Sequence, residues 1–377
     1  MTATAADSCN IAFLGDLILG EPEPDFFFDK ARALLASKDL VVGHLEVPHT
    51  HKGREVAFDI PAEPHAPERL FALQRAGVHV ATLAGNHVCD FGREGIVDTL
   101  ATLSAAGILT CGAGEDLAEA RAPARVERRG QRVGILSYNC VGPREACAAP
   151  AKAGCAYVKI VQSDTGAEVG PQTVELQATL PDATSVSDLQ RAIEQLAREV
   201  HVVVVALHKG IVHTPALLAG YERPLAHAAI EAGAHIVVGH HSHILRGIEV
   251  FQGRPIFHGL GNFVTVTRAL NLDNPHPARQ RWAAERRKRF GFTPDPEYVN
   301  YPFHPEAKHA LIADCKVNAQ GHVDAGYLPC FILPSGQPEP HGRDARGQAV
   351  FEYVADISRR AGFDTQFEWQ GDRVLVR

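Results

Sequence analysis

Three histidines, His240, His241 and His243, directly follow an apolar run near the middle of the chain. The run itself, residues 234–238, has the composition of a buried strand. A strand that ends in polar side chains delivers them to the rim of its sheet, where open α/β proteins bind their ligands. Histidine is the commonest metal ligand in proteins, and alternate residues of an irregular loop can both reach one ion. The cluster therefore predicts a metal site at the end of a strand.

The same arrangement recurs along the chain, because further short apolar runs are each followed within a few residues by a side chain of a metal-binding type. The runs are residues 10–15, 40–42, 78–83 and 201–207. The side chains that follow all five runs are Asp16, Glu46, Asn86, His87, His208, His241 and His243. Ligands from separate strand ends can converge only if the strands share one sheet edge. The set exceeds the three or four ligands of a single zinc ion, so a pair of ions about 3.5–4 Å apart fits it better.

Strand-like and helix-like segments alternate along the chain, which is typical of α/β proteins. Helices are predicted at residues 25–38, 67–76, 94–106, 187–198, 216–232 and 345–361, and hairpin turns at Gln252-Gly253 and Gln370-Gly371-Asp372. No repeat or linker divides the chain, so we expect one domain over residues 1–377. It carries insertions at about 142–185 and 268–307 and a C-terminal helix and hairpin. The basic 268–307 insertion is either a solvated helix and loop or a lid that faces the substrate.

The composition excludes several classes of protein. With 45% hydrophobic and 21% charged residues the chain has the profile of an ordinary soluble globular protein. Its net charge of -7 argues against nonspecific binding to nucleic acid or membranes. The N-terminus lacks the basic and apolar regions of a signal peptide, and no stretch approaches the roughly 18 apolar residues of a membrane helix. The 8 cysteines form no Cys-x-x-Cys pair, which favours reduced thiols. We expect a cytoplasmic protein that binds neither nucleic acid nor membrane, and its oligomeric state stays open.

Five sequence blocks resemble, in the same order, those of the CapA proteins. These are a branch of the calcineurin-like metallophosphoesterase superfamily and are named for poly-γ-glutamate capsule synthesis. The blocks are Ile11 to Gly20 with its Gly15-Asp16 pair; Leu45-Glu46 with Pro48 and Thr50; Asn86-His87-x-x-Asp90-Phe91-Gly92; Leu207-His208-x-Gly210; and Gly239-His240-His241-x-His243, continuing to Leu260-Gly261-Asn262-Phe263. The resemblance covers roughly residues 10–265. It implies a four-layer αββα sandwich with the site at the strand ends.

The resemblance also implies a role for each of the candidate ligands and for His87. The implied ligands of one ion are Asp16 and His243, and those of the other are Asn86, His208 and His241. Glu46 takes the place of the bridging carboxylate, and His87 matches the catalytic histidine that stabilises the leaving group or the developing anion. Ile18 stands where the superfamily has a further histidine, which leaves the first ion with fewer imidazoles.

Four residues differ from the types common in the nearer relatives, and we expect them to line the substrate pocket. They are His44, where asparagine is usual; Lys209, where tryptophan is common; His213, where tyrosine is common; and His258, where an aromatic residue is usual. Lys209 and the cationic residues 279–289 would attract a carboxylate group.

These expectations combine into a metal-dependent hydrolase with two divalent transition-metal ions, manganese, iron or zinc. A metal-bridging hydroxide would attack a small acidic amide- or peptide-like substrate, such as a γ-glutamyl compound. Three alternatives stay open. The same dinuclear site would also serve a phosphoesterase, or an epimerase that acidifies a Cα–H next to a chelated carbonyl. The third alternative is a non-catalytic accessory protein of capsule polymer assembly, in which the metals serve structure only.

Overall fold

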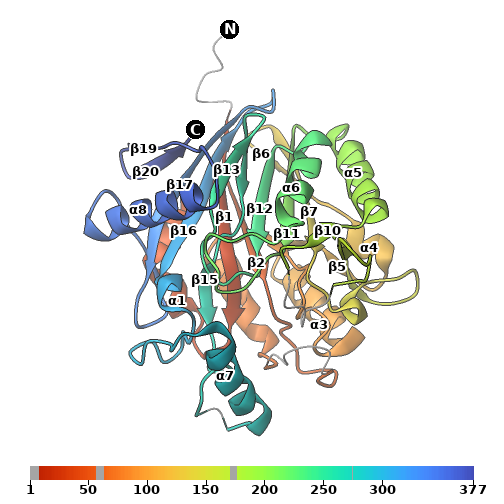
Figure 1. Cartoon of the computed structure of the whole chain (residues 1–377), viewed down its shortest axis with the longest axis vertical. Helices are drawn as coiled ribbons and strands as arrows, with labels where there is room; N and C mark the ends of the chain where they lie inside the picture. Colours follow the sequence, from red (N-terminus) through yellow and green to blue (C-terminus); the bar gives the residue numbers. More distant parts are fainter. Residues whose placement is uncertain (1–7, 57–62, 170–175, 274) are drawn as a thin grey trace.

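The computed structural model describes residues 8–56, 63–169, 176–273 and 275–377. Two large β-sheets lie face to face, and helices cover their outer faces (Figure 1). One apolar cluster lies between the sheets, a second between the larger sheet and its helices, and a third between the smaller sheet and its helices. This is the four-layer αββα sandwich that the sequence predicts.

The larger sheet is mixed. Its strands follow the order β19-β20-β17-β16-β1-β2-β3-β4, with β15 beside β1 and β18 beside β17. The strands β15, β1, β2, β3 and β4 pair in parallel, whereas β16 to β20 pair with antiparallel neighbours. The bounds are β1 Cys9–Leu19, β2 Leu40–Leu45, β3 Val80–Thr82, β4 Leu109–Cys111, β15 Asn262–Val266, β16 His309–Val317, β17 Val323–Ile332, β18 Pro338–Pro340, β19 Phe367–Gln370 and β20 Arg373–Val376.

The second sheet follows the order β13-β14-β12-β11-β7-β6, and its central strands β7, β11, β12 and β14 are parallel. Two short ribbons, β5 with β8 and β9 with β10, involve the 142–185 insertion. The bounds are β5 Ala113–Gly114, β6 Ala124–Arg128, β7 Gln131–Asn139, β8 Gly154–Cys155, β9 Ile160–Gln162, β10 Thr179–Pro181, β11 Val202–His208, β12 Ile236–His240, β13 Ile248–Phe251 and β14 Arg254–Phe257.

Helices cover the two outer faces, whereas α8 contributes Val350, Val354 and Ile357 to the apolar cluster between the sheets. Helices α1, α2 and α3 pack on the larger sheet, and α5 and α6 pack on the second. Helix α7 lies at the lower end of the molecule in Figure 1, within the 268–307 insertion. The bounds are α1 Asp25–Ala36, η2 Pro67–Leu70, α2 Phe71–Arg75, α3 Gly92–Ala105, α4 Leu117–Arg121, η3 Arg144–Ala146, α5 Ala183–Ala197, α6 Glu222–Glu231, α7 Pro277–Phe290, η4 Pro305–Lys308 and α8 Ala345–Arg360.

Both faces of the central strands are buried, which explains why their sequences are continuously apolar. In β1, Ala12 and Leu14 face the helices, whereas Ile11 and Phe13 face the second sheet. The valines at 202–205 of β11 alternate in the same way between the two apolar clusters that flank the second sheet. Successive side chains of a strand point to opposite faces, so a strand segment buried on both sides is apolar at successive positions.

Helices α5 and α6 begin four or more residues away from the predicted position. Helix α5 begins at Ala183, four residues earlier than expected, because the Asp182 carboxylate accepts a hydrogen bond from Ser185 N at 3.0 Å and caps the helix. Helix α6 begins at Glu222 and not at residue 216. The Glu222 carboxylate accepts a bond from Ala219 N at 2.7 Å, which closes a turn ahead of the helix.

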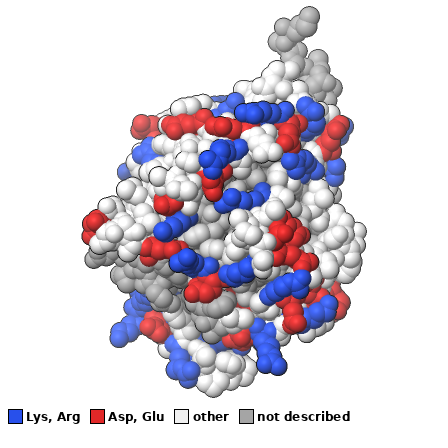
Figure 2. All heavy atoms as spheres, turned by 90° about the vertical axis from the view of Figure 1, so that its right-hand side faces the viewer, with Lys and Arg blue, Asp and Glu red and all other residues white. Residues whose placement is uncertain are grey.

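The molecular surface on the side that carries α5 has a mixed charge. On this face basic and acidic side chains are interspersed (Figure 2). In the part of the chain that the structure describes, every helix is too short or too polar to cross a bilayer.

The core between the two sheets predicts a large cost for truncating Phe13, which is 1% exposed. Phe13→Ala should lower the free energy of unfolding by about 3–5 kcal/mol, because it leaves a cavity between packed sheets. Phe26→Ala is the matched control, since the Phe26 side chain is 45% exposed. Urea denaturation of both variants measures the difference; equal stability of the two would contradict the described packing.

Candidate metal centre

The carboxyl ends of parallel strands from both sheets meet at one place. Strands β1 and β2 bring Asp16 and His44 side by side as paired residues, and β11 and β12 do the same for His208 and His240. The His240 ring joins the sheets, because its Nε2 lies 3.2 Å from the Leu14 carbonyl oxygen. The ring of His44 stacks on that of His240 with centroids 4.6 Å apart. Side chains from two different sheets therefore share one buried site.

Asp16 lies where β1 changes register against both of its parallel neighbours, β2 and β15. Such irregularities re-aim a side chain next to functional sites. A Cβ at Gly15 would lie 2.3 Å from the Gly261 carbonyl oxygen, so only glycine allows this approach. The same carbonyl accepts a hydrogen bond from Asp16 N at 2.9 Å. The Gly15-Asp16 pair thus places a fully buried carboxylate at the junction.

His44, which the sequence led us to expect in the substrate pocket, lies among the ligand candidates. Its Nδ1 lies 3.0 Å from Thr82 Oγ1, and its ring lies 4.8 Å from that of His208. One ligand atom each from Asp16, His44 and His208 lie within 4.8 Å of one another. Thr82 was not anticipated from the sequence, because a threonine in a strand carries no sign of an imidazole partner.

A second group of three is formed by Asp16, Glu46 and His243, whose ligand atoms also lie within 4.8 Å of one another. Glu46 follows the end of β2, and its Oε1 lies 3.0 Å from His243 Nε2. The other nitrogen of His243 lies 2.9 Å from Asn262 Oδ1. The side-chain amide of Asn262 donates a hydrogen bond from Nδ2 to the Tyr301 hydroxyl at 3.0 Å. Asn262 therefore orients His243, a role that its sequence motif did not reveal.

The remaining two predicted ligands adjoin the first group. Asn86 follows β3, and its Oδ1 lies 2.8 Å from His208 Nε2. His241 belongs to neither group of three as the side chains stand, although its ring lies 4.8 Å from that of His208. His241 and His243 have φ angles of 86° and 52°, a left-handed conformation that is uncommon outside glycine and clusters at functional sites.

His87 stands at the edge of this centre, where its side chain is 14% exposed. Its Nδ1 lies 2.8 Å from an oxygen of the buried carboxylate of Asp90. This contact fixes the orientation of the ring. Any proton transfer by His87 therefore uses its Nε2.

Burial shifts the pKa values of the ionisable side chains in the centre. Burial, reinforced by the neighbouring Glu46 carboxylate, raises the pKa of Asp16 well above its usual range. Burial and the neighbouring imidazoles lower the pKa values of His44 and His208 well below the usual range, so both rings are neutral at neutral pH. Burial opposes a charge on His243 too, but the Glu46 and Asp16 carboxylates outweigh it and raise the pKa of His243.

Several buried atoms of the centre lack a hydrogen bond within the described ranges 8–56, 63–169, 176–273 and 275–377. They are both carboxylate oxygens of Asp16, Oε2 of Glu46, Nε2 of His44, and Nδ1 of His208, His240 and His241. An unsatisfied buried polar atom costs about 1–3 kcal/mol, so this concentration calls for a ligand. Carboxylate oxygens with neutral imidazole nitrogens are the donor set of divalent transition metals. The residues present thus fit metal ions.

Lys209 and His258, which the sequence led us to expect in the substrate pocket, are fully buried and contact each other and two glutamates. The Lys209 ammonium donates to Glu222 at 2.8 Å and to the carbonyl of His258 at 3.1 Å, and it lies 3.2 Å from His258 Nδ1. The other nitrogen of His258 lies 3.0 Å from Glu249 Oε2. Both residues have an exposed fraction of 0%. The Lys209 ammonium balances the charge of the buried Glu222 carboxylate, whereas burial lowers the pKa of His258 to about 4 and keeps its ring neutral.

His213 does lie beside the centre. Its ring is stacked near that of His243 with centroids 6.1 Å apart. It also contacts Phe290, Phe292 and Phe303 of the 268–307 insertion.

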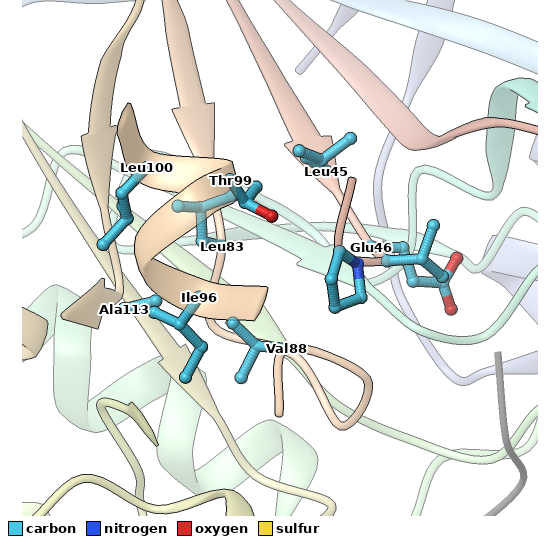
Figure 3. A pocket seen from close by; sticks show the side chains of 10 residues that line it. Leu45, Glu46, Leu83, Val88, Ile96, Thr99, Leu100 and Ala113 are labelled. Carbon is cyan, nitrogen blue, oxygen red and sulfur yellow. The ribbon is translucent and has the colours of Figure 1, made fainter. Parts of the chain in front are cut away.

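A small apolar cavity adjoins the centre behind Glu46, as Figure 3 shows. The carboxylate of Glu46 points away from the apolar side chains of Ile96 and Leu100 on α3. The lining residues are Leu45, Glu46, Val47, Pro48, Leu83, Val88, Ile96, Thr99, Leu100 and Ala113. These apolar neighbours keep water away from the back of Glu46, which strengthens its attraction to a cation.

The sequence profile of the family described as bacterial capsule synthesis protein PGA_cap matches residues 10–267. A probable polyglutamine synthesis accessory protein of Mycobacterium tuberculosis is 34% identical over 203 residues, which are 52% of this chain and 48% of that protein. The PGA biosynthesis protein CapA of Bacillus subtilis is 27% identical over 270 residues, which are 68% of this chain and 63% of that protein. The chain thus matches about half of the mycobacterial relative's length.

The solved structure of the calcineurin-like phosphoesterase YfkN from Bacillus subtilis is similar at a TM-score of 0.41 and 13% identity, covering 94% of this chain and 98% of that one. The profile match covers all five blocks that carry the sequence resemblance, from Asp16 to Asn262. The chain belongs to the PGA_cap family of bacterial capsule synthesis proteins.

Proposed function

We propose that the protein is a metal-dependent hydrolase that acts on a small acidic amide- or peptide-like substrate, such as a γ-glutamyl compound. The observation that carries the proposal is the convergence of buried, unpaired carboxylate and imidazole atoms at the meeting point of the two sheets. Two divalent ions, manganese, iron or zinc, would supply Lewis acidity and a hydroxide nucleophile at neutral pH. The names of the relatives, which refer to PGA and polyglutamine synthesis, support the choice of a glutamyl substrate.

We assign the shared carboxylate to Asp16 in place of Glu46, because Asp16 is the member common to both groups of three. His44 and His208 complete one group, and Glu46 and His243 complete the other. Asn86 and His241 adjoin His208 and join its group in the proposal. An ion held by Asp16, Glu46 and His243 would have one imidazole ligand, and the isoleucine at position 18 supplies no second one.

The chain's own residues have distinct tasks in the proposed reaction. His87 delivers a proton from Nε2 to the leaving group, while Asp90 holds its Nδ1 and stabilises the charged ring. Asn262 keeps His243 oriented toward the carboxylates. We further propose a small molecule as the partner, in place of nucleic acid or a membrane surface, and the net charge of -7 supports this choice.

Turnover and metal content together test this function. Purified protein should carry close to two equivalents of transition metal and release p-nitroaniline from γ-glutamyl-p-nitroanilide. Turnover of p-nitrophenyl phosphate instead would make the protein a phosphoesterase. Metal without turnover of either compound would favour an epimerase or an accessory protein, and absence of metal uptake would refute the hydrolase.

The shared position of Asp16 predicts that Asp16→Asn loses both ions, whereas Glu46→Gln loses about one of two. The amide cannot supply the negative charge that holds both cations. Asp25→Asn is the control, because this carboxylate is 38% exposed and pairs with Arg75 at the surface. Elemental analysis after dialysis measures the stoichiometry. Retention of both ions by Asp16→Asn would place the centre elsewhere.

The role of His87 predicts that His87→Ala keeps its metal and loses activity by a factor of about 10²–10⁴. Asp90→Asn should lose less, because the imidazole remains and only its orientation is weakened. Steady-state kinetics with metal analysis of the same samples separates the two effects. Loss of metal from His87→Ala would make this residue a ligand.

Metal affinity should rise with pH and level off above the pKa values of Asp16 and His243. Both pKa values are raised in the metal-free protein, so below them a proton on either side chain competes with the ion. His44 and His208 are already neutral, because their pKa values are lowered, and they add no such dependence. Calorimetric titrations in two buffers of different ionisation enthalpy count the protons released. An affinity that is constant from about pH 5 to 8 would contradict this charge assignment.

A further inference from the structure

Helix α7 contacts two loops, one that follows a strand of the larger sheet and one that follows a strand of the second sheet. Near its beginning, Arg279 pairs with Glu55 at 3.3 Å and with Glu63 at 3.7 Å, both in the segment after β2. Near its end, Arg286 contacts His213, which follows β11. The 268–307 insertion is therefore anchored on both sides of the candidate metal centre, and it forms part of the wall around it.

Arg286 is a buried cation without a carboxylate partner among the residues the structure describes. Its NH1 donates to the Pro302 carbonyl at 2.8 Å, and its Nε and NH2 lie 3.3 and 3.1 Å from His213 Nε2. Its guanidinium also lies over the rings of Phe292 and Phe303, at 5.2 and 5.5 Å from their centroids. A buried charge held only by neutral groups costs stability, and an incoming anion would relieve this cost.

The contact with Arg286 fixes the protonation of His213. A guanidinium can only donate hydrogen bonds, so Nε2 of His213 must accept, and the proton of the neutral ring lies on Nδ1. That Nδ1 is buried and has no hydrogen-bond partner in the described part of the chain. His213 itself is 8% exposed. The ring therefore presents an unused donor whose position Arg286 determines.

His213 is held next to the ligand candidates by its backbone as well. Its N–H donates to the carbonyl of Ser242 at 2.8 Å, in the loop between His241 and His243. Its φ angle of 58° lies in the left-handed region, which a histidine adopts only where the surrounding structure imposes it. The imidazole is thus kept beside His243 against a local conformational preference.

We propose that His213 donates a hydrogen bond from Nδ1 to an anionic oxygen of the substrate, a carboxylate or a phosphoryl oxygen, and that Arg286 acts through it as a positioning residue. This inference rests on the proposed function, because it names the group of the substrate that lies beside the metal centre. In this proposal the 268–307 insertion takes part in substrate recognition. The sequence left open whether the insertion is a solvated helix and loop or a lid that faces the substrate.

The test uses the zinc-loaded full chain and two probes, inorganic phosphate and glutarate, in calorimetric titrations. His213→Ala and Arg286→Gln should each weaken binding by about tenfold or more, the usual effect of losing a hydrogen bond to a charged group. His213→Asn should stay within about threefold, because an asparagine tolerates the positive φ and places an N–H close to Nδ1. The probe that suffers the larger loss identifies the oxyanion as carboxylate or phosphoryl.

Arg281→Gln is the matched control, since Arg281 lies on the same helix, is exposed, and carries the same charge. Its variant should bind both probes as the unmodified protein does. Equal affinity of all variants for both probes, with zinc still bound, would overturn the inference and leave the proposed hydrolase intact. Equal weakening by Arg281→Gln and Arg286→Gln would also overturn it, because net charge alone would then explain the effect.

Nitrogen-15 spectra of the metal-free protein report which ring nitrogen of His213 carries the proton. A purely structural role of Arg286 would leave this tautomer unchanged. The His213 resonances, assigned with His213→Asn, should show a proton on Nδ1, and Arg286→Gln should shift the ring toward the other tautomer or a mixture. A proton on Nε2 in the unmodified protein would overturn the inference. Failure of the protein to take up zinc would refute the proposed function, and the tautomer would still decide whether Arg286 controls His213.

Discussion

The junction between the two sheets concentrates charge where water is excluded, and this constraint governs the rest of the structure. Asp16 is fully buried, and the nearest opposite charge is the imidazole of His243, with Nδ1 3.5 Å from Oδ2. Such a carboxylate is tolerated only because the chain surrounds it with groups that can share a cation. The bulge in β1, the close approach at Gly15 and the left-handed histidines all maintain this arrangement at a local cost in strain.

Much of the fold was predictable because the core strands are buried on both sides. A run such as residues 201–207 has one plausible position in an α/β protein, and the structure gives β11 at 202–208. The hairpin turns at Gln252-Gly253 and Gln370-Gly371 were equally clear, and the structure pairs β13 with β14 across the first and β19 with β20 across the second. Helix starts were less predictable. The cap at Asp182 and the turn before Glu222 depend on single hydrogen bonds, which periodicity does not reveal.

The ligand candidates were predictable by type and place, but their grouping was not. The sequence shows that Asp16, Glu46 and His208 follow strands, and it cannot show which atoms come within reach of one ion. His44 illustrates the difference: within a strand its side chain could point to either face, and only the pairing of β1 with β2 sets it beside Asp16. Lys209 shows the converse. Its partner Glu222 is thirteen residues away, and the sequence places it inside the helix predicted at 216–232, with no sign of an ion pair.

The participation of Asp16 in both groups of three has a consequence for how the centre would fill. Two cations that depend on one aspartate are energetically linked, since the first to arrive neutralises the charge that would attract the second. The first ion also fixes the orientation of the Asp16 carboxylate, which helps the second ion to bind. Occupancy of one position then changes the affinity of the other, so the sensitivity of such a centre to metal supply is a property of the pair and not of either ion alone.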